Sequence, residues 1–321
     1  MKVRVLSDLH LDVNSNYCFN LPAKDDTFTV VGGDTAGDPE VAIKWLKKNV
    51  KRGIVIAGNH IVYNFRKKPI QELREEMAKA FPVYSDVSYL DVMTGVCSKV
   101  VDGVLFIGTT LYTDFKYTTL GTNRDWNMSK SYRTMNDFRY GIIKVSPSSL
   151  GEIDEFAKRE YMTPKDYLEW FEKSFAEITR IVEENEKSEK SLPVFIVTHH
   201  CPDPGCVDAK YVDSDVNSSY ISDLRKFIVE HPSIRAWCCG HCHCQKHFEI
   251  ERPNDNPCLI VMNPRGYVPY GDDIDFNKNT FIDTETWQFS QKTPSKTQIN
   301  KRNKRLEEQK KKYEAIMGCF F

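Results

Sequence analysis

The sequence predicts an α/β protein whose functional residues gather at one edge of a β-sheet. Five short apolar runs recur along the chain, and each run ends in an Asp, Asn or His residue. Amphipathic helical patterns lie between most of these runs. In open α/β sheets, ligands bind outside the carboxyl ends of the strands, where loops from different strands converge. The polar residues that follow the runs therefore form the candidate site.

The five apolar runs are predicted strands, and further strands complete the fold. The runs and the residues that follow them are 3–6 with Asp8 and His10, 28–31 with Asp34, 53–57 with Asn59 and His60, 194–197 with His199, and 234–237 with His241 and His243. Residues 104–107 and 258–262, and a closing hairpin through 280–282 and 287–289, are predicted as additional strands. Because the runs are almost continuously apolar, helices or a second sheet must cover both faces.

Four helices are predicted between the strands. Residues 38–50 and 69–81 carry apolar side chains at helical spacing. A long helix opens at Thr163, the expected N-cap, carries an apolar stripe as far as Val182 and ends in the solvated run 183–191. A fourth helix is expected over about 220–229. The polar, aromatic-rich segment 112–162 is too long for an ordinary connection, which favours a functional lid or a partly helical insert.

Composition and charge divide the chain into a body and a tail. The 321 residues are 40% hydrophobic, enough for a packed core, and carry a net charge of −1. Between Lys292 and Lys312, nine residues are basic and two are acidic. We expect a folded body over 1–291 and a basic tail over 292–321, which is more typical of a solvated arm than of a nucleic-acid binder. The sequence shows neither a signal peptide nor the roughly 20-residue apolar run of a membrane span, so a cytoplasmic location without membrane contact is expected.

The residue types at the strand ends point to metal ions. The donors are Asp8, His10, Asp34, Asn59, His60, His199, His241 and His243. Carboxylate with imidazole suits Mn, Fe, Zn or Ni better than Mg or Ca. So many donors exceed one tetrahedral site but suit two ions about 4 Å apart, which can hold both the attacking and the leaving oxygen of a phosphoryl displacement. Two divalent ions, two carboxylates and a hydroxide leave a charge of about +1, which attracts a phosphate ester.

Five motifs occur in order, each after a predicted strand: Asp8-x-His10, Gly33-Asp34, Gly58-Asn59-His60, Thr198-His199-His200-x-Pro202 and Gly240-His241-x-His243. Together they resemble the calcineurin-like metallophosphoesterases over residues 8–243. The resemblance implies a four-layer αββα sandwich, in which two mixed β-sheets pack face to face and are flanked by helices. It also implies a dinuclear metal-dependent phosphohydrolase acting on phosphomonoesters or phosphodiesters.

The resemblance assigns roles to the motif residues. Asp8, His10, Asp34 and His243 would bind one metal ion, and Asp34, Asn59, His199 and His241 would bind the other, with Asp34 bridging. A metal-bridging hydroxide would be the nucleophile, and His60 would be the acid that protonates the leaving oxygen or stabilises the developing charge. The His-x-x-Pro pattern of the family favours His199 over His200 as a ligand, which leaves His200 as a neighbour able to touch phosphate.

Three further segments resemble a bacterial and phage branch of the family with no assigned substrate. They are Met135-Asn136-Asp137-Phe138-Arg139, residues 217–224 and Asn263-Pro264-Arg265-Gly266-Tyr267. From the first segment, Asn136 and Arg139 are candidate substrate contacts. The chain departs from the protein Ser/Thr phosphatases of the superfamily, because Thr35 follows Asp34 and Ile61 follows His60. The arginine clamp and the aspartate partner of the acid histidine are missing from their usual places, and Asp38 is a possible substitute for that partner.

The cysteines and the function each leave alternatives open. Cys238, Cys239, Cys242 and Cys244, with His247 nearby, could bind a structural zinc ion. Alternate side chains of an extended segment point to opposite faces, however, which favours bystander thiols. Cys201 and Cys206 are likewise expected to be loop thiols. Two other functions compete with the phosphohydrolase: a nuclease on DNA or RNA, which the basic tail permits, and a non-catalytic protein-binding scaffold, which predicts gaps in the ligand set.

Overall fold

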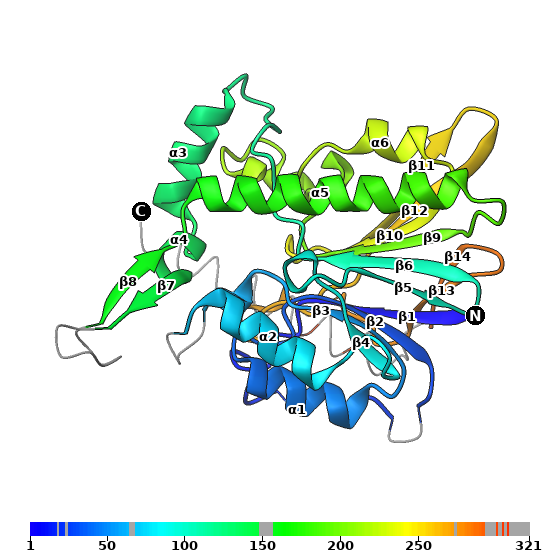
Figure 1. Cartoon of the computed structure of the whole chain (residues 1–321), viewed down its shortest axis with the longest axis horizontal. Helices are drawn as coiled ribbons and strands as arrows, with labels where there is room; N and C mark the ends of the chain where they lie inside the picture. Colours follow the sequence, from blue (N-terminus) through cyan, green and yellow to red (C-terminus); the bar gives the residue numbers. More distant parts are fainter. Residues whose placement is uncertain are drawn as a thin grey trace.

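The computed structural model describes residues 1–17, 19–22, 25–63, 68–147, 157–272 and 275–292, with the single positions 300, 304 and 307. Two six-stranded sheets pack face to face, and helices cover the outer face of each sheet (Figure 1). The predicted αββα sandwich of two mixed sheets is therefore confirmed. The predicted basic tail lies outside the described residues, apart from Lys292 and the three single positions.

The first sheet has the strand order β14-β13-β1-β2-β3-β4. Its strands are β1 (Lys2–Leu6), β2 (Phe28–Gly32), β3 (Gly53–Ile56), β4 (Val87–Tyr89), β13 (Thr280–Asp283) and β14 (Gln288–Gln291). Strands β1 to β4 pair in parallel, whereas β13 pairs antiparallel with β1, and β14 with β13. The carboxyl ends of β1, β2 and β3 therefore lie together at one edge.

The second sheet has the strand order β11-β12-β10-β9-β6-β5. Its strands are β5 (Ser98–Val101), β6 (Val104–Thr109), β9 (Val194–Thr198), β10 (Ile234–Cys239), β11 (Lys246–Arg252) and β12 (Asp255–Met262). The four central strands pair in parallel, and each edge strand pairs antiparallel with its neighbour. All the strands expected from the sequence occur, and within the two large sheets β4, β5 and β11 are additional.

Four helices cover the two sheets. Helices α1 (Pro39–Asn49) and α2 (Ile70–Ala80) lie over the first sheet, and α5 (Pro164–Lys187) and α6 (Arg225–Glu230) over the second (Figure 1). The Asp38 side chain caps α1 by accepting a hydrogen bond from the Glu40 backbone N–H. Short 3₁₀ helices lie at His60–Val62, Val92–Thr94, Pro204–Cys206, Ala209–Tyr211, Asn217–Ser219 and Val268–Tyr270.

Helix α6 begins later than the predicted 220–229. The backbone N–H groups of Ser222 and Leu224 donate to the carbonyl groups of Cys201 and Pro202 instead of continuing a helix. This pairing joins the chain before α6 to the loop after β9, and so the helical spacing of the sequence is overridden by tertiary contacts over its first turn.

The segment expected to be a lid or a partly helical insert contains two helices and a hairpin. These are α3 (Arg124–Thr134), α4 (Asp137–Tyr140), β7 (Ile142–Ser146) and β8 (Lys158–Tyr161). They extend from one end of the sandwich, beside the start of α5 (Figure 1). Helix α4 brings buried Asp137 to the carboxyl end of β3, where it contacts Asn59.

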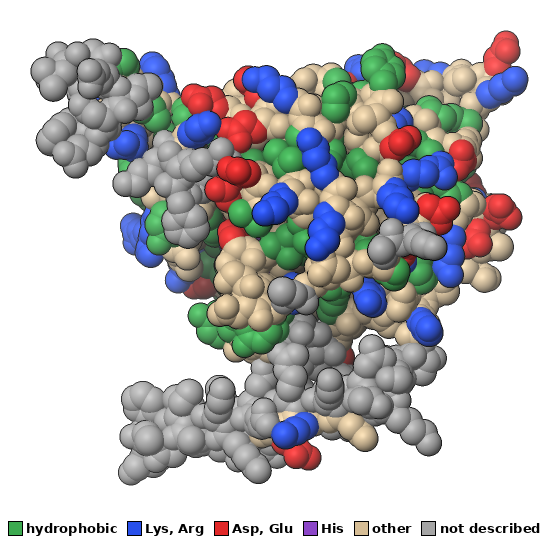
Figure 2. Space-filling view, turned by 90° about the horizontal axis from the view of Figure 1, so that it is seen from below, with side chains coloured by type: hydrophobic (Ala, Val, Ile, Leu, Met, Phe, Trp, Pro, Cys, Tyr) green, Lys and Arg blue, Asp and Glu red, His purple; other side chains and the backbone are tan. Residues whose placement is uncertain are grey.

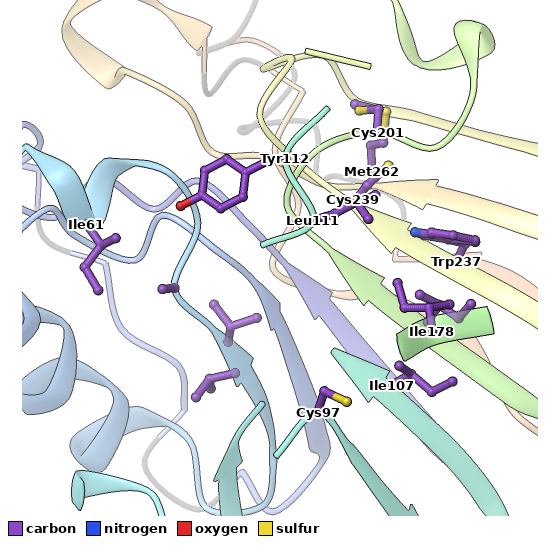
Figure 3. Packing of buried hydrophobic residues seen from close by; sticks show 14 of the residues in the cluster. Ile61, Cys97, Ile107, Leu111, Tyr112, Ile178, Cys201, Trp237, Cys239 and Met262 are labelled. Atoms are coloured by element: carbon purple, nitrogen blue, oxygen red, sulfur yellow. The ribbon is translucent and has the colours of Figure 1, made fainter. Parts of the chain in front are cut away.

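Alternate side chains of each strand face two separate apolar layers. Val5 of β1, Phe106 of β6 and Phe195 of β9 lie between the sheets, where the two phenylalanine rings are 5.1 Å apart. The other faces pack under the helices, as Trp237 of β10 does with Ile178 of α5 (Figure 3). Each fully buried side chain of this size contributes about 1.5–3 kcal/mol to stability. These layers hold the strand ends, and hence the candidate site, in place.

The described surface mixes charges of both signs. On the face covered by α1 and α2, basic and acidic side chains are interspersed (Figure 2). Lys44, Lys47 and Lys48 of α1 belong to the exposed set. None of the helices in the described part of the chain is long and apolar enough to cross a membrane.

Candidate metal centre

The predicted metal ligands come together where the carboxyl edges of the two sheets meet. Asp8 and His10 follow β1, Asp34 follows β2, Asn59 and His60 follow β3, His199 follows β9, and His241 and His243 follow β10. The two edges are linked, because the His241 backbone N–H donates to Asp8 Oδ1 at 3.0 Å. Asp8, His10 and His199 are completely buried.

The backbone at the ligand positions is strained. Asp8, His10, Asp34, His241 and His243 all have left-handed conformations, with φ angles between 44° and 65°. Non-glycine residues rarely adopt this region, and each such residue costs on the order of 1–3 kcal/mol. Strain concentrated at five positions of one edge is typical of a functional site whose geometry the surrounding fold imposes.

Two motif positions must be glycine, because the proposed ligand carboxylates lie too close to their backbone for a side chain. A Cβ atom at Gly58, which has a φ of +81°, would lie 2.1 Å from Asp34 Oδ1. A Cβ atom at Gly240 would lie 2.5 Å from Asp8 Oδ2. Both distances are shorter than any tolerated contact, so a side chain at either position would displace a carboxylate.

One group of donors surrounds Asp8. Asp8, His10 and His243 each offer one atom, and these three atoms lie within 4.8 Å of one another. His243 Nε2 is 3.5 Å and His10 Nε2 is 3.9 Å from Asp8 Oδ1. The two imidazole nitrogens face each other at 2.9 Å. Two nitrogens and a carboxylate oxygen that converge in this way match the donors of one metal site.

A second group of donors surrounds Asp34. His199 Nε2 lies 3.1 Å from Asp34 Oδ2 and 2.8 Å from Asn59 Oδ1. The His241 ring lies 5.1 Å from the His199 ring, measured between centroids. Asp34 Oδ2 is also 3.9 Å from His10 Nε2, which belongs to the first group. The Asp34 carboxylate therefore lies between the two groups.

Other residues hold the ligands in orientation, and the sequence did not identify them. Asp272 Oδ2 accepts from His243 Nδ1 at 2.9 Å, so the Nε2 atom faces the first group. The Gly32 carbonyl likewise accepts a hydrogen bond from His199 Nδ1 at 2.9 Å, so the Nε2 atom of His199 faces the second group. Asp137 Oδ1 accepts from Asn59 Nδ2 at 2.8 Å, which turns the Asn59 oxygen towards His199. Such partners fix the tautomer and direction of metal ligands.

The donor set fits divalent metal ions. Three buried atoms, Asp8 Oδ2, His10 Nδ1 and His241 Nε2, have no hydrogen-bond partner among the described residues. A buried polar atom without a partner costs about 1–3 kcal/mol. Buried charges in proteins are either paired or coordinate metals. Here carboxylates and imidazoles converge, and some of their buried atoms have no hydrogen-bond partner among the described residues. The centre therefore offers to a cation oxygen and nitrogen donors that the protein itself leaves unpaired.

The imidazoles differ in their affinity for protons. Burial lowers the pKa of His199, but the charge of Asp34 and the hydrogen bond to it outweigh burial and raise the pKa to about 9. Burial likewise opposes protonation of His243, and its hydrogen bonds to Asp272 and Asp8 outweigh burial and raise its pKa to about 10. Burial and neighbouring imidazoles lower the pKa of His10 and of His241 well below the usual value. A metal ion must therefore displace protons from His199 and His243.

His60 lies beside the two groups and faces a cleft. Its Nε2 atom is 2.9 Å from the Tyr267 hydroxyl and 4.0 Å from Asp34 Oδ2. Its backbone N–H donates to Asp34 Oδ1 at 2.9 Å. Asp38, considered as a partner for this histidine, caps helix α1, and it is Tyr267 that the structure places at Nε2. The signal was available in the sequence, since Tyr267 ends one of the segments singled out there.

An open cleft of about 520 Å³ lies over the centre. Its walls come from the metal centre, the insert and the loop 207–220, and include Asp34, Asn59, His60, Asn136, Lys210, Tyr211, Tyr220, His241, His243, Tyr267 and Asp272. Among the candidate substrate contacts, Asn136 lines the cleft. Arg139 is exposed and donates to Arg133 O and Asn136 Oδ1.

His200 is placed differently from the expected substrate contact. It is completely buried, and it is not one of the residues that line the cleft. Its Nε2 atom is 2.8 Å from the Tyr167 hydroxyl, and its Nδ1 atom is 3.2 Å from the Thr110 carbonyl. Both ring nitrogens are thus engaged by the protein, which argues against a contact with phosphate.

Two mixed sheets under helices, with Asp, His and Asn donors at their common carboxyl edge, define the class of metal-dependent phosphoesterases. A model of the calcineurin-like phosphoesterase family matches residues 1–245, and the chain belongs to this family. It is accordingly a hydrolase of phosphoric esters. Among curated proteins, no sequence matches the chain, so the relation to a bacterial and phage branch stays a prediction.

Solved structures share the fold at low sequence identity. The phosphopantetheinyl hydrolase of Mycobacterium tuberculosis has a TM-score of 0.57 and 15% identity, with 83% of this chain and 89% of that chain covered. A dimetal phosphatase from Danio rerio has a TM-score of 0.41 and 12% identity, with 84% and 88% covered. The first similarity supports the fold alone, and the second is too weak to support an argument.

Proposed function

We propose that the protein is a dinuclear metal-dependent phosphohydrolase that cleaves phosphomonoesters or phosphodiesters. The observation that carries the proposal is the position of the Asp34 carboxylate, 3.1 Å from His199 and 3.9 Å from His10, between two groups of donors. A carboxylate shared by two groups suits a pair of ions. A scaffold protein has no need of such a complete set of converging ligands.

Seven side chains are proposed to hold the ions. Asp8, His10, His243 and Asp34 would bind one ion, and Asp34, Asn59, His199 and His241 the other. Manganese, iron, zinc and nickel suit these nitrogen and oxygen donors. When bound, the ions would polarise the phosphate and lower the pKa of water towards neutrality.

His60 is proposed as the acid for the leaving oxygen. It lines the cleft together with Asp34, and its Nε2 atom lies 4.0 Å from Asp34 Oδ2. The Tyr267 hydroxyl, 2.9 Å from Nε2, orients the ring. A positioned acid contributes about 10²–10⁴-fold to such a reaction.

The cleft sets the proposed substrate contacts. Asn136 lines it and is a proposed contact for the ester, whereas Arg139 would first have to break its hydrogen bonds to Arg133 O and Asn136 Oδ1. Lys210 also lines the cleft, where it pairs with Asp208 at 3.5 Å, and an anionic substrate would compete with that carboxylate for its charge. Tyr211 and Tyr220 offer aromatic surface, so the volume leaves room for an organic group beyond the phosphate.

Activity assays on two model esters test the proposal. The purified protein, reconstituted separately with Mn, Fe, Zn and Ni, is expected to hydrolyse p-nitrophenyl phosphate or bis-p-nitrophenyl phosphate. Asp34→Asn should lose metal and activity together. His60→Ala should keep its metal and lower kcat by about 10²–10⁴-fold. His247→Ala, which changes an exposed histidine stacked on Phe289, is the control.

Two outcomes would contradict the proposal. Failure to hydrolyse either ester with any of the four metals would favour the scaffold. Full activity of His60→Ala would remove histidine acid catalysis. If removal of the residues after Lys292 weakens binding to DNA or RNA at low salt while ester hydrolysis is unchanged, the nuclease becomes the better description of the substrate.

The proposal also includes the domain boundary and the cellular compartment of the protein. Strand β14 ends at Gln291, which supports a catalytic domain over 1–291 followed by a basic tail over 292–321. The eight cysteines within the described ranges form no disulfide, which suits a reducing, cytoplasmic compartment.

A further inference from the structure

Four cysteines lie close in sequence to the histidines that follow β9 and β10. They are Cys201, Cys206, Cys239 and Cys242, and together they are called the thiol cluster. The sulfur atoms of Cys201, Cys206 and Cys239 all lie within 4.8 Å of one another. The sulfur of Cys242 lies 3.6 Å from that of Cys201, at the side of this group of three. Cys201 and Cys239 are seen in the buried cluster beside Met262 (Figure 3).

The thiol cluster differs from the zinc site considered in the sequence. Cys238 faces the layer between the sheets, whereas its neighbour Cys239 faces the opposite side, as the alternation of a strand requires. The Cys244 thiol donates to the Cys206 carbonyl at 3.0 Å and His247 stacks on Phe289. Cys201 and Cys206, expected to be loop thiols, are completely buried members of the cluster.

Two of the sulfur distances match tetrahedral coordination of zinc. Zinc–thiolate bonds of about 2.3 Å in a tetrahedron place the sulfur atoms about 3.8 Å apart. Here the Cys206 and Cys239 sulfur atoms are 3.8 Å apart, and those of Cys201 and Cys242 are 3.6 Å apart. A disulfide requires about 2.05 Å. Isolated buried thiols behave as small apolar side chains and have no reason to converge on one point.

The position of the thiol cluster indicates a structural role. Cys201 lies two residues after His199, Cys239 ends β10, and Cys242 stands between His241 and His243. Cys206 adds the short helix Pro204–Cys206 from the loop that borders the cleft. An ion held by the four thiols would therefore tie together the segments that position three proposed ligands of the metal centre.

We propose that Cys201, Cys206, Cys239 and Cys242 form a structural zinc site, separate from the Asp and His centre, that fixes the loops carrying His199, His241 and His243. Three of its members are fully buried, and the fourth, Cys242, is half-buried at the wall of the cleft. Four protein ligands leave no open coordination position, which is typical of structural rather than catalytic zinc. Coordination by four thiolates also distinguishes it from the neighbouring centre, which offers only oxygen and nitrogen donors.

X-ray absorption at the zinc edge tests this site directly in the full-length protein. In zinc-replete wild-type protein we expect sulfur neighbours of zinc at about 2.3 Å and one bound ion per chain beyond those of the Asp and His centre. Asp34→Asn should lose ions bound through oxygen and nitrogen but keep the sulfur-bound zinc. The result therefore does not depend on whether the phosphohydrolase proposal succeeds.

A double variant and a neighbouring control assign the sulfur ligands. Cys206→Ser with Cys239→Ser should lose the sulfur signal and one zinc ion per chain. Cys238→Ser changes the adjacent, equally buried residue of β10 and should retain both. If the double variant fails to fold, titration of the wild-type protein with a mercurial decides, because blocking the thiols should release one zinc ion per chain.

Three results would overturn the proposal. Zinc without sulfur neighbours in the wild-type protein would show that the thiols do not bind it. An intact mass two hydrogens lower under non-reducing conditions would show a disulfide in the cluster instead. Mercurial titration that consumes the thiols without releasing zinc would show that they are free.

Discussion

Single hydrogen-bond partners set the direction of two imidazoles in the metal centre, those of His199 and His243. His243 can present Nε2 to an ion because its Nδ1 atom is held by Asp272 at 2.9 Å. Asp272 lies outside the five motifs, 29 positions after His243 along the chain. Its contribution is geometric and electrostatic, since the carboxylate fixes the tautomer and increases the basicity of the ligating nitrogen.

Asp272→Asn is therefore expected to weaken metal binding by about 10–100-fold while leaving the ligand set intact. Competition with a fluorescent chelator measures this affinity. Glu186→Gln is the matched control, because Glu186 makes a hydrogen bond of similar length, 2.8 Å, to His231 away from the centre. An affinity equal to that of the wild type in both variants would show that Asp272 does not orient His243.

Some residues of the site could be predicted from the sequence, and others could not. The donors were recognisable because each follows a strand in a short motif. Asp137, Asp272 and Tyr267 were not identified as partners, because each comes from a segment distant in sequence from the residue it contacts, and tertiary folding brings the pairs together. His200 had the right residue type beside His199, but its burial against Tyr167 could not be inferred from the spacing.

At the scale of elements, helix α4 anchors the insert to the centre through one carboxylate. Asp137 is completely buried and accepts hydrogen bonds from Asn59, Tyr63 and Tyr167. These donors come from the loop after β3 and from α5, so a single side chain joins three elements. The raised pKa of Tyr63, caused by burial and by the nearby Asp137 charge, keeps its hydroxyl protonated as a donor.

Asp137→Asn is expected to lower the free energy of unfolding by about 1.5–3 kcal/mol, because it removes the charge that three donors share. It should also weaken metal binding, since Asn59 loses its fixed orientation. Urea unfolding and metal titration give the two values. Asp125→Asn, on the exposed face of α3, is the control. Loss of stability without any change in metal affinity would restrict Asp137 to a structural role.

The prediction of elements succeeded where the apolar signal is continuous and failed at three of the four sheet edges. The central strands are buried on both faces and were all recognised. Strand β5 is half-exposed, and β11 alternates exposed and covered residues, so neither forms an apolar run. Strand β4 has only three residues. Edge strands carry polar residues that discourage association with other sheets, and this removes the pattern by which central strands are found.

A buried ion pair links strand β1 to the loop before β2. Arg4 Nη2 lies 2.6 Å from Asp25 Oδ2. Burial opposes ionisation of Asp25, but its hydrogen bonds with Arg4 and Thr27 outweigh burial and lower its pKa to about 2. A folded pKa below the unfolded value of about 3.9 means that this stabilisation is present above about pH 5 and is lost as the pH falls towards 2.

Asp25→Asn should lower the free energy of unfolding at pH 7 by about 1–2 kcal/mol, after allowance for solvent screening. The difference from the wild type should shrink as the pH falls from about 5 towards 2. Urea unfolding at a series of pH values follows it. Asp26→Asn changes the adjacent, exposed carboxylate and should show no such trend. A difference independent of pH would mean that the Asp25 charge is not responsible.

At the scale of the whole molecule, the metal centre lies on the seam between the two sheets. Ligands after β1, β2 and β3 belong to the first sheet, and those after β9 and β10 to the second. An ion bound by ligands from both sheets would therefore cross-link the two halves of the sandwich. The left-handed ligand residues and the buried atoms without partners oppose this arrangement, so the fold maintains it at a cost of several kcal/mol.

Metal binding should consequently raise the thermal stability of the entire domain. An ion that binds only the native state at 100 times its Kd contributes about 2.7 kcal/mol, which corresponds to a rise in Tm of several degrees for a domain of this size. Manganese is the suitable probe, because it prefers oxygen and nitrogen donors and does not favour the thiol cluster. Chelated protein should melt at a lower temperature than the same protein after addition of Mn²⁺. The rise should disappear in Asp34→Asn, which lacks the shared carboxylate, and persist in His247→Ala. If Mn²⁺ raises the Tm of Asp34→Asn as much as that of the wild type, the ion binds elsewhere and does not join the two sheets through this carboxylate.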